Sequence, residues 1–145
     1  MILILMDAIF AFLLICCAAS DRRTRIIPNS MICALLWLSA FHLAIVCVQG
    51  GSILPYLMAI PLFFLCFMCW KRGAFGGGDV KLMTAICFYF GFWQAAIAFE
   101  VSLVLMLIRY GLACRRNRRM RIALAPPLAW GSLITLAGQY IMAII

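Results

Sequence analysis

Residues 82–108, LMTAICFYFGFWQAAIAFEVSLVLMLI, decide how many times this chain crosses a membrane. One membrane-spanning helix takes about 20 residues, so this run is long for one span and short for two. A single helix would put the basic residues after the run across the membrane from those before it, although Lys and Arg tend to stay on the cytoplasmic side. A break near residues 91–94 keeps them together, and we therefore predict two spans, at about residues 80–92 and 95–114.

The composition of the whole chain indicates a membrane protein. Of its 145 residues, 68% are hydrophobic and 11% are charged, and the mean hydropathy is +1.16. A soluble domain is usually about half apolar and about a quarter charged. The composition therefore excludes an ordinary soluble domain, a disordered chain and a nucleic-acid-binding domain.

Six spans with short loops use nearly the whole chain. Besides the two spans above, apolar runs predict spans at about residues 2–19, 31–48, 53–70 and 123–145. The predicted fold is an all-α, polytopic bundle of six transmembrane helices that forms one domain over residues 1–145. With three basic loops on the cytoplasmic side, both termini are expected on the non-cytoplasmic side.

The net charge of +8 comes from three basic clusters. They are Arg22, Arg23 and Arg25; Lys71, Arg72 and Lys81; and Arg109, Arg115, Arg116, Arg118, Arg119 and Arg121. In so apolar a chain, these clusters mark cytoplasmic ends of spans, where they can pair with acidic headgroups of the lipid bilayer.

Neither a metal nor another cofactor is expected. Most of the eight cysteines lie in apolar runs, where a free cysteine behaves as a small hydrophobe. Cys66 and Cys69 have CxxC spacing, but the chain has no second pair to complete a four-sulfur zinc site. The single histidine, His42, is expected to hydrogen-bond to a neighbouring helix.

The chain has four acidic residues, Asp7, Asp21, Asp79 and Glu100, and ionisable groups at membrane depth tend to mark function. In the six-span arrangement, Asp21 ends the first span and Asp79 begins the fourth, so both lie at the cytoplasmic face. Two close carboxyl groups share one proton. The ionised one can deprotonate water while the protonated one donates to the carbonyl oxygen of a peptide bond.

Simpler interpretations of the same residues remain open. Asp21 beside two arginines can be a solvated loop charge, Asp79 can be only a helix N-cap, and a run of three glycines can be only a flexible turn. Asp7 and Glu100 lie nearer the other side, where we expect a polar contact between the first and fifth spans; a proton or ion path is the alternative.

Residues around the two aspartates favour the catalytic interpretation. Gly76, Gly77 and Gly78 lack side chains, so the backbone can turn sharply and a substrate strand can come close to Asp79. The Pro28-Asn29 pair stiffens the loop after Asp21 and starts the second span. Lys81 can bias the ionisation of Asp79 or anchor in headgroups.

Two sequence blocks resemble the type IV prepilin peptidases, membrane aspartic proteases with a GxGD motif. The first is Asp21 followed by Ile27-Pro28-Asn29, and the second is residues 76–82, GGGDVKL, similar to the family's GxGDxKL. A weaker third block, residues 125–131 (APPLAWG), is similar to the proline-rich start of the family's last span, and we assign no catalytic role to it. The order of the blocks and the span pattern match over essentially the whole chain.

The resemblance implies that Asp21 and Asp79 form a catalytic dyad, supported by the motif residues Pro28, Asn29, Gly76, Gly78 and Lys81. It implies a multi-pass protein of the bacterial inner membrane that cuts prepilin or pilin-like precursors between a short basic leader and an apolar helix. No cofactor or nucleic acid is implied, and the oligomeric state stays open. The chain starts at the first span and is similar to the short, peptidase-only forms of tight-adherence (Flp) pilus systems. The alternatives are a small transporter or channel subunit and a non-catalytic pilus or secretion scaffold.

Overall fold

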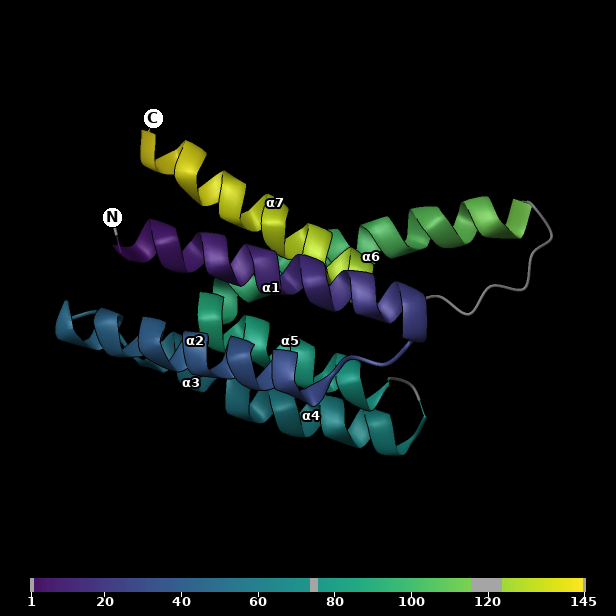
Figure 1. Ribbon diagram of the computed structural model, residues 1–145, viewed down its shortest axis with the longest axis horizontal. Helices are drawn as coiled ribbons and strands as arrows, with labels where there is room; N and C mark the ends of the chain where they lie inside the picture. Colours follow the sequence, from purple (N-terminus) through teal and green to yellow (C-terminus); the bar gives the residue numbers. More distant parts are fainter. Residues whose placement is uncertain (1, 74–75, 116–123, 145) are drawn as a thin grey trace.

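The computed structural model describes residues 2–73, 76–115 and 124–144, and all regular structure in these ranges is helical (Figure 1). The helices are α1 (Ile2–Thr24), α2 (Asn29–Val48), α3 (Leu54–Leu57), α4 (Ala59–Lys71), α5 (Gly77–Phe90), α6 (Phe92–Arg115) and α7 (Ala125–Ile144). Four stretches, namely α1, α2, α3 with α4, and most of α6, are long and apolar enough to cross a membrane. The all-α membrane fold is confirmed.

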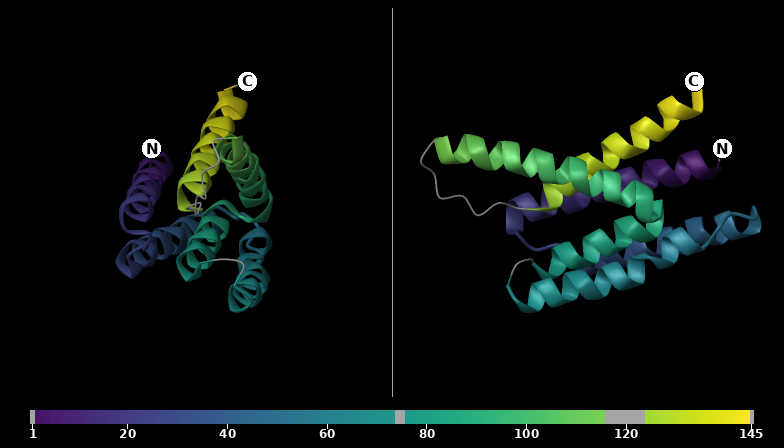
Figure 2. Two further views of the ribbon diagram at one scale, coloured as in Figure 1. Left: turned by 90° about the vertical axis from the view of Figure 1, so that its right-hand side faces the viewer. Right: turned by 180° about the vertical axis from the view of Figure 1, so that it is seen from behind.

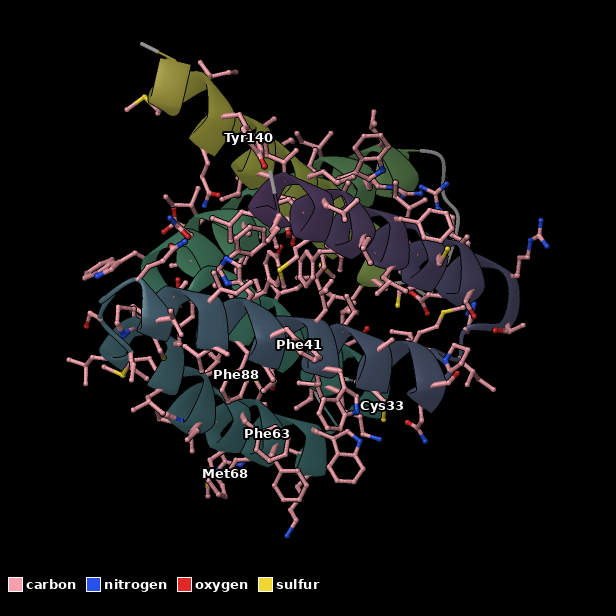
Figure 3. The ribbon with its side chains drawn as sticks, turned by 60° about the vertical axis from the view of Figure 1, so that its left-hand side comes forward. Cys33, Phe41, Phe63, Met68, Phe88 and Tyr140 are labelled. Carbon is pink, nitrogen blue, oxygen red and sulfur yellow. The ribbon has the colours of Figure 1, made fainter. Side chains whose placement is uncertain are left out.

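Helices α3 and α4 form one bent rod, which leaves six rods as predicted. The bend is at Met58, between the two helices. Pro61 explains it, because proline has no N–H to bond to the carbonyl group of Leu57 one turn earlier. The outer faces of the rods carry exposed apolar side chains, including Phe41 on α2 and Met68 on α4 (Figure 3). Such side chains suit contact with lipid.

The ends of the rods are sorted as the charge pattern predicted. The last turn of α1, the end of α4, the start of α5 and the far end of α6 all lie at one end of the bundle, whereas α1 begins and α7 ends at the other (Figure 1). Residues Arg116, Arg118, Arg119 and Arg121 of the third basic cluster, and residue 123 at the expected start of the last span, are outside the described residues. Which end faces the cytoplasm stays a prediction.

The break between α5 and α6 is confirmed at Gly91. This residue has a φ of +77°, in the left-handed region that favours glycine, and a Cβ there would lie 3.3 Å from the Cβ of Pro55. At the other end of the bundle, a predicted boundary is wrong: α1 continues to Thr24, so Asp21 lies on the helix rather than in a loop. The helix stops where Arg25 adopts a φ of 54°.

Helix α5 forms the centre of the core. It contacts α2, α3, α4, α6 and α7, and the view along the bundle shows it between α2 and α4, with α6 and α7 above it (Figure 2, left). Its side chains Leu82, Ile86 and Tyr89 are almost fully buried, and Phe10 of α1 stacks on the ring of Tyr89 with centroids 3.8 Å apart. Because protein surrounds α5, its 14 residues need not match the bilayer thickness.

A polar cluster at the end of the bundle near the termini joins three helices. The hydroxyl groups of Tyr89 on α5 and Tyr140 on α7 each donate a hydrogen bond of 2.5 Å to a different carboxylate oxygen of Asp7 on α1. Tyr140 is labelled in Figure 3 beside the first turns of α1. We expected Asp7 to contact the fifth span, which is α6, but its partners lie on α5 and α7. Glu100, the acid of the fifth span, is exposed.

A further expectation about this region, the hydrogen bond of His42 to a neighbouring helix, is not met. The neighbouring Tyr89 is 1% exposed and lies inside the bundle. The imidazole of His42 stacks on the ring of Tyr89 with centroids 4.6 Å apart. Its buried Nδ1 has no hydrogen-bond partner among the described residues, so this atom does not make the contact that we predicted.

Helices α6 and α7 cross at Gly131 with almost no space between their backbones. A Cβ at Gly131 would overlap the carbonyl oxygen of Ala98 and the hydroxyl group of Ser102, both on α6. The Ala98 oxygen belongs to the backbone and cannot rotate away. Close approach at this glycine therefore sets the distance between α6 and α7.

We predict that Gly131→Ala lowers the free energy of unfolding by about 1–3 kcal/mol, since the added methyl group forces the two helices apart. Thermal unfolding of the purified protein in detergent would measure the change. The matched control is Gly138→Ala on the same helix, where a Cβ meets nothing within 4 Å. Equal stability of the two variants would contradict the close crossing.

Candidate active site

Asp21 is buried and joins α1 to the start of α7. It is 7% exposed, and its carboxylate accepts a hydrogen bond of 3.3 Å from the backbone N–H of Ala125. The first N–H groups of a helix have no partner within the helix, and the positive end of the helix dipole favours a negative charge there. Asp21 therefore caps α7 from another helix and is not a solvated loop charge.

Asp79 also lies beside the start of α7. It lies in the first turn of α5, ahead of the apolar run that starts at Val80, and so outside the membrane-spanning part of the helix. Its side chain lines a cleft together with Leu124 and Pro127 at the start of α7. The N-cap of α5 is Gly76, and the carboxyl group of Asp79, the third residue of the helix, reaches back to the Gly76 backbone as in a capping box.

The two carboxyl groups are close enough to interact electrostatically. Burial, the largest cause, and the negative charge of Asp21 together raise the pKa of Asp79 from 3.8 to about 6, against a lowering contribution from the Gly76 backbone. The structure thus brings Asp21 and Asp79 to one place at one end of the bundle. Their catalytic role stays a prediction.

The segments around the two aspartates contact each other. The ammonium group of Lys81 donates a hydrogen bond of 3.0 Å to the side-chain oxygen of Asn29. Gly78 packs against Ile27, whose Cδ1 would lie 3.4 Å from a Cβ at position 78. The carbonyl group of Pro28 accepts hydrogen bonds from the N–H groups at the start of α2. The motif residues therefore hold the end of α1, the start of α2 and the start of α5 together.

The described residues offer no evident metal site. Within residues 2–73, 76–115 and 124–144, no three His, Cys, Asp or Glu side chains come together as ligands of a metal ion would.

The profile of the Type IV leader peptidase family matches residues 8–111, which include both aspartates and both motif segments. The chain belongs to this family. The resemblance to type IV prepilin peptidases is thereby confirmed.

Three curated relatives carry the name prepilin leader peptidase/N-methyltransferase. The chain is 31% identical to the Dickeya chrysanthemi protein over 94% of its own length, 24% identical to the Dichelobacter nodosus protein over 90%, and 33% identical to the Bacillus subtilis (strain 168) protein over 87%. These matches cover 50%, 45% and 52% of the three relatives, so the chain spans about half their length. No solved structure matches the chain significantly.

Sequence reasoning about this family member missed the contribution of α7. We assigned no catalytic role to residues 125–131, yet Ala125 bonds to Asp21, and Pro127 lines the cleft beside Asp79. The available signal was the proline pair at positions 126 and 127. Proline is favoured in the first turn of a helix, where its missing N–H is not needed. Prolines at these positions mark the start of a helix, and the free N–H groups at a helix start can bind the carboxylate group of a nearby acidic residue.

The absence of a side chain at Gly76 leaves room for the carboxyl group of Asp79. A Cβ at position 76 would lie 2.8 Å from Oδ2 of Asp79, closer than real Cβ atoms approach. At the next position, a Cβ at Gly77 would meet only the ring of Trp70, at an ordinary contact distance of 3.4 Å. The two neighbouring glycines therefore differ in their effect on the aspartate.

We predict that Gly76→Ala reduces any activity that depends on Asp79 by at least about tenfold, because a displacement of about 1 Å at a reacting group is that costly. Gly77→Ala, the matched control, keeps most of the activity. Both variants should keep the thermal stability of the parent, since the Asp79 side chain can rotate. A Gly76→Ala variant as active as Gly77→Ala would show that the close contact is unimportant.

Proposed function

We propose that this chain is an aspartic endopeptidase of the bacterial inner membrane. It cleaves the leader peptide from type IV prepilin or pilin-like precursors at the cytoplasmic membrane face, with Asp21 and Asp79 as the catalytic pair. The observation that carries the proposal is the meeting of two carboxyl groups, from α1 and α5, at the first turn of α7. Membership of the leader peptidase family and the names of the curated relatives support the substrate class.

The different surroundings of the two aspartates suggest different roles. Asp21, at the positive end of α7, is the ionised group and takes a proton from water as the water oxygen attacks the carbonyl carbon of the scissile peptide bond. Asp79, whose pKa is raised to about 6, is the protonated group and donates to the carbonyl oxygen. When the tetrahedral intermediate collapses, the C–N bond breaks. The proton held by Asp21 then passes to the leaving nitrogen, and Asp79 recovers its proton from the hydroxyl group that becomes the carbonyl.

The remaining features of the chain fit this role. We propose that α1 to α7 make up one peptidase domain, in contact with lipid over its exposed apolar faces. The basic side chains near Asp21, such as Arg22 and Arg23, lie at the proposed cytoplasmic end, where they pair with acidic headgroups. Substrate therefore meets the two aspartates at the edge of the bilayer.

The rival proposal of a transport path through the four acids has less support. Both carboxylate oxygens of Asp7 accept hydrogen bonds from tyrosines, and Glu100 lies on an exposed face of α6. The acids thus form one pair at one end and two separate residues elsewhere, rather than a continuous row.

We predict that Asp21→Asn and Asp79→Asn each lower the cleavage rate by about 10²–10⁴-fold, because each removes one partner of the acid–base pair. The rate is measured as leader removal from a co-expressed type IV prepilin on an immunoblot. The controls Asp7→Asn and Glu100→Gln remove the other two acids and should keep cleavage. Undiminished cleavage by either of the first two variants would rule out the catalytic pair. If the protein is a non-catalytic scaffold, even the unaltered chain will cleave no precursor.

The pH dependence of cleavage should reveal which aspartate is the acid. Because burial and the Asp21 charge raise the pKa of Asp79 to about 6, Asp79 keeps its proton below that pH and loses it above. We predict that kcat/KM falls as the pH rises through about 6. Rate measurements on protein in liposomes across this range would test it. A rate that rises with pH over the same interval would make Asp79 the base instead.

A further inference from the structure

A cleft of about 320 Å³ starts at Asp79 and lies between α5, α6 and α7. Apart from Asp79, its walls are largely apolar, with Met83 on α5, Phe99, Leu103 and Met106 on α6, and Leu128 on α7. Its volume is at the small end of the range for ligand pockets, about 300–1,000 Å³. It therefore suits one or two side chains rather than a whole helix.

The direction of the cleft follows from helix geometry. Phe99, Leu103 and Met106 are spaced four and three residues apart, so they form one stripe on α6 about 10 Å long. On α5, Met83 lies one turn beyond Asp79 in the direction of the bundle centre. The cleft thus runs from the carboxyl group at the polar end toward the middle of the membrane-spanning part.

Three further clefts among the described residues do not reach the aspartates. One lies beside Phe67 and Trp70, a second beside Asn29 and Cys33, and a third beside Arg22; neither aspartate lines any of the three. A peptide bond held at Asp79 can therefore extend into the bundle through the cleft between α5, α6 and α7.

We propose that this cleft binds the apolar side chains of the substrate that directly follow the cleaved bond, and that Leu103 and Met106 set their size. The inference rests on the proposed peptidase function. The leader lies on the polar side of the scissile bond, and the apolar segment of the precursor continues toward the membrane, which is the direction of the cleft. An apolar residue in the cleft holds the scissile carbonyl group beside Asp79.

The test uses two precursors that differ only in the first residue after the cleaved bond, Ala in one and Leu in the other. Met106→Trp fills the cleft with a larger side chain. We expect the KM for the Leu precursor to rise by about tenfold or more, the usual discrimination of an apolar pocket, while the Ala precursor is cut almost as before. Met106→Ala enlarges the cleft and should relax the preference toward larger residues.

The matched control is Leu107→Trp, at the next position of α6, where the side chain is 60% exposed and does not line the cleft. It should leave both KM values unchanged. Two outcomes would overturn the assignment of the cleft, provided that the unaltered protein cleaves both precursors. One is an equal rise of the KM for both precursors in Met106→Trp, and the other is unchanged KM values in both Met106 variants. Failure of the unaltered protein to cleave either precursor would instead overturn the peptidase function.

Discussion

The hydrogen bond between the Asp21 carboxylate and the N–H of Ala125 holds the site together. A helix that starts inside an apolar bundle has N–H groups that neither its own turns nor water can satisfy, and leaving such a group unpaired costs about 1–3 kcal/mol. Proline at positions 126 and 127 removes two of these donors, and Asp21 takes the one at Ala125. The first turn of α7 is thereby fixed against α1, where Leu124 and Pro127 form a wall beside Asp79.

The same three helices are joined a second time at the other end of the bundle. Asp7 lies on α1 about 21 Å from Asp21 and accepts hydrogen bonds from Tyr89 on α5 and Tyr140 on α7. Between these two polar contacts lies an apolar core that includes Phe10 and Ile86. Polar contacts at both ends and apolar packing between them define how α1, α5 and α7 lie relative to one another. This arrangement gives Asp7 a structural role without a part in the chemistry.

The pattern of apolar runs and basic clusters was enough to predict the six rods and their direction. Since each span reverses direction, the same pattern placed Asp21 and Asp79 at one end, and the Gly91 break decided this outcome. The end of α1 was not predictable from hydropathy, because it depends on local hydrogen bonds of Ser20 and Thr24 to the carbonyl oxygen of Ile26.

The tertiary partners of the polar residues were not predictable either. The Asp21–Ala125 bond joins residues 104 positions apart, and the Tyr140–Asp7 bond joins residues 133 apart. Periodicity in one helix says which face is apolar, but it does not say which other helix covers that face. The burial of Tyr89 follows from the central position of α5, which no local pattern in a short apolar segment indicates.

The apolar cleft and the acidity of Asp79 are physically linked. Burial is the largest cause of the raised pKa of Asp79, and part of that burial comes from the cleft walls on α6 and α7. An apolar substrate side chain in the cleft displaces more water from the carboxyl group, and removal of water disfavours the charged form. In the proposed complex, substrate binding therefore stabilises the protonated form of Asp79 that donates to the scissile carbonyl oxygen. Asp21 is hydrogen-bonded to α7 and does not line the cleft, so a side chain bound there acts on Asp79 and not on Asp21.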